Sequence, residues 1–316
     1  MSKKRLFYKL GPVFWSIVIF LIAQILTFAT VWQQSTFLDE EGIYVPTQPP
    51  DIISIWPGDV VQPDGSVVYV QPFSALGPIL IYFFVVIIVI SLVLYFIPLH
   101  LLNKLMRILF AVLFGWGVFV ALAIWLHWGL SLVLATIVGL VWLFYPRIWL
   151  HNIVMVLAMV SLASVFGHFI SPWTAIALLG ALAIYDLLAV RFGFMMWLAG
   201  RLSNSNAIPA FIFPRRGREW RSGIQDASFS NAEGEKPGER RFSILGGGDI
   251  AFPLLVSAAC FFDLGFRPAL TIGLFGLVGL IAAYVIQMTV LKGRPMPALP
   301  PIAVACVIGL LLVSPL

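Results

Sequence analysis

The feature that most constrains this chain is a succession of unbroken apolar runs, each close to 20 residues long. A helical run of this length matches the hydrocarbon core of a bilayer. The runs are continuous rather than alternating, which argues against a membrane β-barrel. Only 10% of the residues are charged and 61% are hydrophobic, whereas a soluble domain carries about 25% charged residues. The sequence therefore predicts an all-α, polytopic membrane protein.

Nine membrane spans can be placed along the chain. They lie at residues 10–32, 75–97, 107–126, 129–146, 150–169, 173–197, 246–265, 268–290 and 297–315. Very short loops join the third to the sixth, which predicts antiparallel neighbours in a compact bundle. The first run is longer than the core of a signal peptide and lacks a small-residue cleavage site, so we expect it to be retained.

Two long connections divide the chain into three expected regions. Residues 1–199 form a bundle of spans one to six with an acidic extracytoplasmic loop at 33–73, residues 200–243 form a basic, partly disordered cytoplasmic loop, and residues 244–316 hold spans seven to nine. Turn residues flank Val67–Val70, which is therefore a candidate for a short strand pair.

Two parts of the basic loop have a distinctive composition. Ser222–Gly238 is rich in Ser, Gly, Asn and Glu and is expected to be disordered. The apolar segment Ala207–Pro214 is interpreted as a membrane-surface patch, with a plug or an internal cleavage segment as the alternatives.

The distribution of basic residues predicts the orientation. With the N-terminus in the cytoplasm, 18 of the 19 Lys and Arg residues fall on or near the cytoplasmic side, and only Arg267 lies outside. We therefore expect a cytoplasmic N-terminus and an extracytoplasmic C-terminus. The net charge of +5 follows from this topology, so it does not indicate a nucleic-acid partner.

Three other patterns predict packing rather than chemistry. Gly273, Gly276 and Gly279 form a small-residue face for close helix packing. Asp263 and Arg267 lie four residues apart and are expected to form an interfacial ion pair. The histidines are interpreted as interfacial packing residues; they are His100, His127, His151 and His168.

Two carboxylates lie within the apolar runs, Asp186 in the sixth span and Asp249 at the start of the seventh. A charge at the centre of a membrane helix costs about 2.5–3.5 kcal/mol on insertion scales, so such residues are usually functional. The structural alternatives are an ion pair of Asp186 with Arg191, whose five-residue spacing suits a helix poorly, and a helix cap for Asp249. Counting along the two antiparallel spans puts both acids at a similar depth, towards the cytoplasmic side.

Two facing carboxylates at one depth suit the chemistry of an aspartic protease, in which one acts as a base towards water and the other as an acid towards the scissile carbonyl. Paired intramembrane aspartates also serve proton or cation pathways, so a channel or transporter is the alternative function. A carrier usually has broken helices in two matching halves, and no such repeat is evident. No zinc-protease, serine-nucleophile or phosphate-loop motif occurs, and no metal or cofactor is expected.

Three motifs resemble those of the presenilin and signal peptide peptidase family. Tyr185-Asp186 resembles the Tyr-Asp pair of that family's sixth span. Gly246-Gly247-Gly248-Asp249 matches the Gly-x-Gly-Asp motif of the seventh, and Pro297-Ala298-Leu299 matches the Pro-Ala-Leu motif that begins the ninth. All three occur in the expected order and in the expected spans.

The resemblance implies an intramembrane aspartyl endopeptidase of the Gly-x-Gly-Asp type, with Asp186 and Asp249 as the catalytic dyad. It also implies a substrate-positioning role for a further set of residues, namely Tyr185, Gly246, Gly248, Pro297, Ala298 and Leu299. The orientation is that of presenilins, which favours single-span substrates with a cytoplasmic C-terminus. The expected partners are these transmembrane helices and the lipid bilayer, with a homo-oligomer left open. The small chain indicates a prokaryotic, archaeal homologue in the plasma membrane.

Overall fold

The structure is a computed structural model of the chain. It describes residues 3–40, 58–61, 67–70, 99–192, 208–215, 217–227, 241–291 and 296–313, and six single residues between 81 and 96. The helices are α1 (Lys3–Glu40), α3 (Leu99–Ala123), α4 (Trp128–Phe144), α5 (Ile148–Phe169), α6 (Pro172–Arg191), α8 (Gly248–Leu264), α9 (Phe266–Thr289) and α10 (Leu299–Val313). The strands are β1 (Gly58–Val61), β2 (Val67–Val70), β3 (Ala210–Pro214) and β4 (Phe242–Gly246), with two 3-10 helices at η2 (Gly217–Arg221) and η3 (Ile224–Ala227).

The predicted class, a polytopic helical membrane protein, is confirmed. Five helices are long and apolar enough to cross a membrane, namely α1, α3, α5, α6 and α9, and α4 and α10 are shorter apolar helices. Each predicted span except 75–97 corresponds to one helix, although α1 continues beyond residue 32 to Glu40. The span 75–97 falls almost entirely outside the described residues, so the predicted total of nine stays a prediction.

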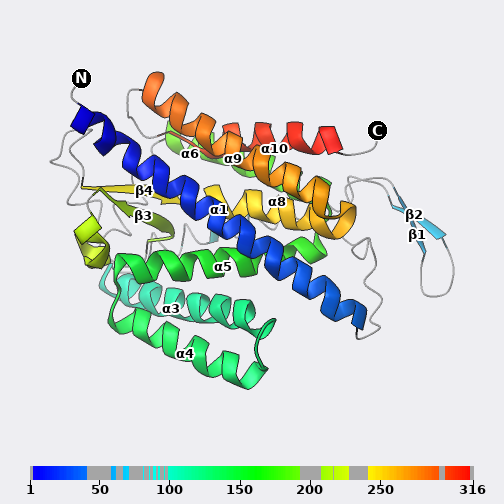
Figure 1. Cartoon of the computed structure of the whole chain (residues 1–316), viewed down its shortest axis with the longest axis horizontal. Coiled ribbons are helices and arrows are strands. Elements are labelled where there is room, and N and C mark those ends of the chain that lie inside the picture. Colours follow the sequence, from blue (N-terminus) through cyan, green and yellow to red (C-terminus); the bar gives the residue numbers. More distant parts are fainter. Residues whose placement is uncertain are drawn as a thin grey trace.

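Helix α8 lies at the centre of the bundle and packs against α1, α5, α6, α9 and α10. Figure 1 shows α3, α4 and α5 on one side of it, α6, α9 and α10 on the other, and α1 crossing the bundle. The apolar residues of α8 are buried from Ile250 to Phe261, apart from the half-buried Phe252. A helix that is apolar around its whole circumference is usually buried in this way.

Large apolar side chains are exposed on the outer helices, as expected for surfaces in contact with lipid. Examples are Val112 on α3, Ile137 on α4, Val278 on α9 and Val304 on α10, each more than half exposed. In water such surface would be costly, whereas in a bilayer it is solvated by lipid chains. The exposure pattern therefore agrees with a membrane environment.

The predicted glycine face of α9 is confirmed as a close-packing surface. A Cβ at Gly279 would lie 2.6 Å from Cα of Ile302 on α10, and a Cβ at Gly276 would lie 3.0 Å from Cβ of Pro253 on α8. Gly273 faces Gln24 of α1. Small residues at these points let α9 approach three different helices closely.

Two antiparallel strand pairs lie at opposite ends of the helices (Figure 1). The predicted strand at Val67–Val70 is confirmed, and it pairs with β1. The second pair joins β3 to β4, which are distant in sequence, and it lies at the same end of the bundle as the start of α1. This second pair leads directly into α8, and it therefore positions the start of that helix.

Three expectations for the loops are wrong. Ala207–Pro214 is not a surface patch, because its residues Ala210–Pro214 form the fully buried strand β3. Within Ser222–Gly238, the start is ordered, since Ile224–Ala227 form η3 and Ile224 is fully buried; residues 228–238 lie outside the described residues. Asp263 and Arg267 form no ion pair, and the ion pair found among the described residues joins Arg241 to Glu219 at 3.3 Å.

Candidate active site

Asp186 lies near the C-terminal end of α6 and is only 5% exposed. The helix begins sharply because Ser171 caps it and Pro172 occupies its first position, where the missing proline N–H removes no helical hydrogen bond. From that start, regular helix carries the chain to Asp186 without interruption. The carboxylate is thus held on a rigid element within apolar surroundings.

The carboxylate of Asp186 is bound to the start of α10. The backbone N–H of Leu299 donates a hydrogen bond to Oδ2 of Asp186 at 3.3 Å. Leu299 is the first residue of α10, so its N–H has no acceptor within its own helix. The positive end of the helix dipole also faces the acid. Pro297 and Ala298, both half-buried, come directly before this contact, so all three residues of the motif lie beside Asp186.

Asp249 is the second residue of α8 and is half-buried. Strand β4 ends at Gly246, Gly247 precedes the helix, and Gly248 begins it. A Cβ at Gly246 would lie 3.0 Å from Oδ2 of Asp249, and a Cβ at Gly248 would lie 3.1 Å from Cε2 of Phe252. The carboxylate therefore folds back over Gly246, which has room for it because it lacks a side chain.

The two acids lie at the same end of neighbouring antiparallel helices. Helix α6 packs against α8; Asp186 is close to the end of α6, and Asp249 is at the beginning of α8. The alternative pairing of Asp186 with Arg191 is not present, because the single ion pair within the described ranges joins two other residues.

Tyr185 precedes Asp186 and is half-buried. Its hydroxyl makes no hydrogen bond to any residue that the structure describes. Among all the residues that the structure describes, no three His, Cys, Asp or Glu side chains lie together as metal ligands would. The chemistry available at the site is therefore that of two carboxylates and the backbone groups around them.

Two residues at the start of α5, His151 and Asn152, bind the strand pair that leads into α8, and the sequence did not predict these contacts. His151, interpreted as an interfacial packing residue, is fully buried, and Asn152 is 3% exposed. Both bind the backbone of β3, at Ala210 and Ile212. The available signal was the occurrence of two adjacent polar residues within an apolar span, where each is costly without a partner.

Comparison with known proteins identifies the family. A family model described as "Signal-peptide peptidase, presenilin aspartyl protease" matches residues 58–314. The chain belongs to this family. The protein is therefore an aspartic endopeptidase, and nothing supports the channel alternative. No curated protein matches the chain.

The fold also resembles solved structures. Two crystal forms of a presenilin family intramembrane aspartate protease are similar to it. The C222 form has a TM-score of 0.55 at 18% identity and covers 96% of this chain and 97% of its own. The P2 form has a TM-score of 0.51 at 20% identity and covers 94% of both chains. The architecture thus matches along nearly the whole length of each protein.

The contact between Gly246 and Asp249 leads to a prediction. Gly246→Ala places a methyl group 3.0 Å from Oδ2 of Asp249, so the carboxylate must move. Displacing a reacting group by about 1 Å can cost on the order of 100-fold in rate. The shift needed here is only a few tenths of an ångström, so we expect cleavage of a single-span test substrate to fall roughly 3- to 10-fold. Gly11→Ala is the control, since a Cβ there meets no atom within 4 Å. Full activity of Gly246→Ala would show that the carboxylate is not confined by this contact.

Proposed function

We propose that this protein hydrolyses peptide bonds within the transmembrane segments of single-span membrane proteins, with Asp186 and Asp249 as the catalytic dyad. The observation that carries this proposal is the placement of the two acids at the same end of the packed helices α6 and α8. Neither has a basic partner among the described residues. Two acids kept in such surroundings without counter-ions have a strong energetic reason to be functional.

The two acids divide the proton transfers of hydrolysis between them. One carboxylate takes a proton from a water molecule while the water oxygen attacks the scissile carbonyl carbon. The other, protonated, gives its proton to the carbonyl oxygen, which forms a tetrahedral gem-diol. When the C–N bond breaks, the first carboxyl group gives its proton to the leaving nitrogen, and the second takes a proton from a gem-diol hydroxyl, which regenerates the resting pair. Each step therefore requires both carboxylates.

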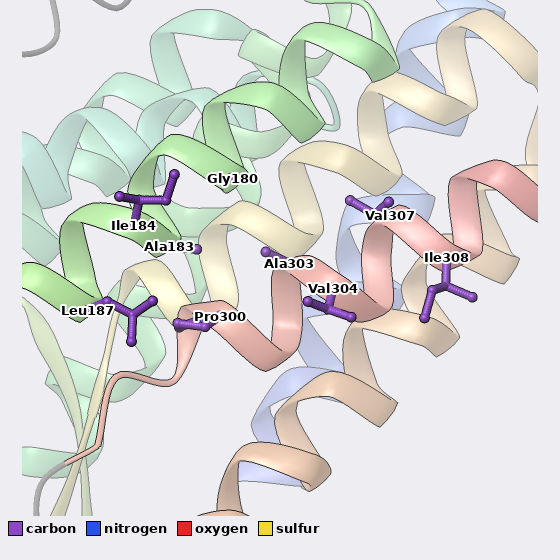
Figure 2. A pocket seen from close by; sticks show the side chains of 9 residues that line it. All are labelled: Gly180, Ala183, Ile184, Leu187, Pro300, Ala303, Val304, Val307 and Ile308. Carbon is purple, nitrogen blue, oxygen red and sulfur yellow. The ribbon is translucent and has the colours of Figure 1, made fainter.

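An apolar groove between α6 and α10 is the proposed path of the substrate (Figure 2). It has a volume of about 370 Å³. Its lining residues are all apolar: Gly180, Ala183, Ile184 and Leu187 of α6, and Pro300, Ala303, Val304, Val307 and Ile308 of α10. Ala183 and Leu187 flank Asp186 on α6, and Pro300 follows Leu299. A transmembrane segment lying in this groove reaches the dyad at its end.

The edge of β4 opposite β3, which pairs with no other strand among the described residues, is the proposed docking site for the bond to be cleaved. In the β3–β4 ladder, Ile212 faces Ile244, and the N–H and C=O of Ile212 are bound to Asn152 on the side away from β4. This pair is therefore not hydrogen-bonded across the ladder, and the N–H and C=O of Ile244 point away from β3. An unwound substrate segment can add there as a third strand, directly beside the Gly246–Asp249 turn.

The remaining motif residues are proposed to position the substrate. Gly246 and Gly248 keep the backbone accessible at the start of α8, as residues without a side chain allow. Pro297 has no N–H and cannot donate to the preceding chain, and Ala298 and Leu299 hold the turn against Asp186. Tyr185 lies next to the dyad on α6.

The proposed topology has the N-terminus and the β3–β4 sheet on the cytoplasmic side and the C-terminus outside. The excess of Lys and Arg on that side supports it. Substrates would then present a cytoplasmic C-terminus. The proposed location is the plasma membrane of a prokaryote, and the proposed source is an archaeon.

The dyad is tested by separate replacement of each acid. Asp186→Asn keeps an acceptor for the Leu299 N–H, and Asp249→Asn keeps the size of the side chain, but neither amide can exchange a proton. General acid–base catalysis typically contributes about 10²–10⁴-fold, and we expect cleavage in liposomes to fall at least that far in both variants. Cleavage that survives either replacement contradicts the dyad. Ion flux that depends on both acids, without cleavage, would instead favour a channel.

The groove is tested by filling it. A Cβ at Gly180 meets no atom within 4 Å, so the side chain of Gly180→Phe begins in open space at the groove. We expect KM for a single-span substrate to rise about 10-fold with little change in the unfolding temperature, since roughly 1.4 kcal/mol of substrate binding would be lost. Gly11→Phe is the matched control on α1. An unchanged KM in Gly180→Phe would exclude this groove as the path.

The β4 edge is tested with proline. Ile244→Pro removes one N–H from the open edge, and proline is tolerated at such edge positions. A lost hydrogen bond is worth about 0.5–1.5 kcal/mol, so we expect KM to rise roughly 2- to 10-fold. Ser243→Pro is the contrasting variant, because Ser243 pairs with Phe213 and its N–H points towards β3; it should destabilise the sheet itself. If Ile244→Pro binds substrate normally, the substrate does not add to this edge.

A further inference from the structure

The first turns of α5 carry two buried polar side chains that the catalytic mechanism does not use. Asn152 donates from Nδ2 to the carbonyl oxygen of Ile212 at 2.7 Å and accepts at Oδ1 from the N–H of Ile212 at 3.0 Å. One amide side chain thus makes the same pair of bonds that a residue of a neighbouring strand would make.

His151 makes the adjacent contact. The indole N–H of Trp142 donates to Nδ1 of His151 at 3.3 Å. Nδ1 must therefore be unprotonated, and the ring proton is on Nε2. Nε2 donates to the carbonyl oxygen of Ala210 at 2.9 Å. Trp142 and His151 are both fully buried, so this tautomer is held without access to water.

These bonds complete the outer edge of β3. Two backbone hydrogen bonds flank the ladder. The N–H of Arg215 donates to the Arg241 carbonyl and the N–H of Gly247 donates to the Pro209 carbonyl, both at 3.1 Å, so the backbone groups of odd-numbered residues in this segment point towards β4. Those of Ala210 and Ile212 consequently point towards α5, where they meet His151 and Asn152.

The same ladder continues to the catalytic turn. Gly247, held by the Pro209 carbonyl, stands two residues before Asp249. A Cβ at Gly247 would lie 2.9 Å from Cε of Met155 on α5, so the turn also rests directly on that helix. A continuous series of contacts therefore runs from α5 through β3 to the start of α8.

We infer that His151 and Asn152 are positioning residues of the protease, which replace a third strand on β3, hold the Gly246–Asp249 turn in register, and leave β4 as the edge that receives the substrate. The inference rests on the proposed addition of the substrate to β4. It assigns to α5 a part in choosing which peptide bond meets the dyad, although α5 carries neither catalytic acid.

The test uses the full-length protein in liposomes with a single-span test substrate. Asn152→Leu keeps the approximate volume of the side chain and removes both bonds to Ile212. Ser161→Ala is the matched control, because Ser161 lies on the same helix, is buried, and bonds the Gly117 carbonyl of α3 at 2.6 Å rather than the sheet. The measurements are kcat, KM, the cleaved bonds by mass spectrometry, and amide hydrogen exchange of residues 208–214.

We expect Asn152→Leu to lower kcat/KM at least 10-fold, to spread cleavage over neighbouring bonds, and to speed exchange in β3, while Ser161→Ala changes none of these. A merely structural role lowers the active fraction, which reduces the apparent kcat but leaves KM and the cleaved bonds as they were. If Asn152→Leu lowers only the apparent kcat and leaves KM and the cleaved bonds unchanged, the inference is overturned.

A second pair of variants addresses His151. His151→Phe keeps a ring but loses the donor to Ala210, and it should reproduce the spread of cleavage sites. His151→Gln puts an amide N–H near the position of Nε2 and should restore the wild-type cleavage site. If Gln behaves like Phe, the bond to Ala210 has no positioning role. Failure of the proposed function can be told apart from failure of this inference. In that case the wild-type protein would not cleave the substrate, or Asp186→Asn would still cleave it.

Discussion

The active site depends on one requirement, that backbone N–H and C=O groups in apolar surroundings find hydrogen-bond partners. Most of the chain meets it with regular helix. At one end of the bundle, regular helix is interrupted at three places, namely the start of α8, the start of α10 and the β3–β4 strand pair, and backbone groups there lack helical partners. The carboxylate of Asp186 takes one of these groups, the N–H of Leu299, at 3.3 Å. His151 and Asn152 of α5 bind the backbone groups of Ala210 and Ile212 on the outer edge of β3. The groups that point away from β3 along β4 have no strand partner among the described residues, and these are the groups that we propose a substrate binds.

This requirement explains how the three motifs are related. The Tyr-Asp pair provides an acceptor, the Pro-Ala-Leu turn presents a donor to it, and the glycines let a strand pass into a helix while the following carboxylate folds back. The last point is visible at Gly246, where a Cβ would be 3.0 Å from Oδ2 of Asp249. Two of the motifs therefore lie where a helix begins, and the third, within α6, supplies the acceptor.

Much of this arrangement could be predicted from the sequence, because its signals are strong ones. Runs of about 20 apolar residues specify membrane helices with little ambiguity, and the cost of Asp186 and Asp249 in such runs points to function. Depth counted along antiparallel spans brought the two acids to one level, and both do lie at the same end of α6 and α8.

The β3–β4 sheet could not be predicted in the same way. Its strands are five residues long and separated by a stretch of basic and polar composition, so neither alternation nor a hairpin turn marks their pairing. The prediction of a surface patch at Ala207–Pro214 is wrong because apolarity alone does not distinguish contact with lipid from burial under α5. The role of His151 and Asn152 was invisible for the same reason, since their partners are backbone groups of a strand that the sequence did not reveal.

The position of α8 has a consequence for how a substrate approaches the two acids. This helix is enclosed by five others, and shifting it would disturb contacts on every side. Helix α6, by contrast, has an open flank, with Ile184 61% and Leu187 50% exposed. Of the two acids, Asp249 is thus carried by an enclosed helix, and Asp186 by a helix with an exposed flank. A segment that approaches from the lipid therefore meets the described part of α6 before it meets α8.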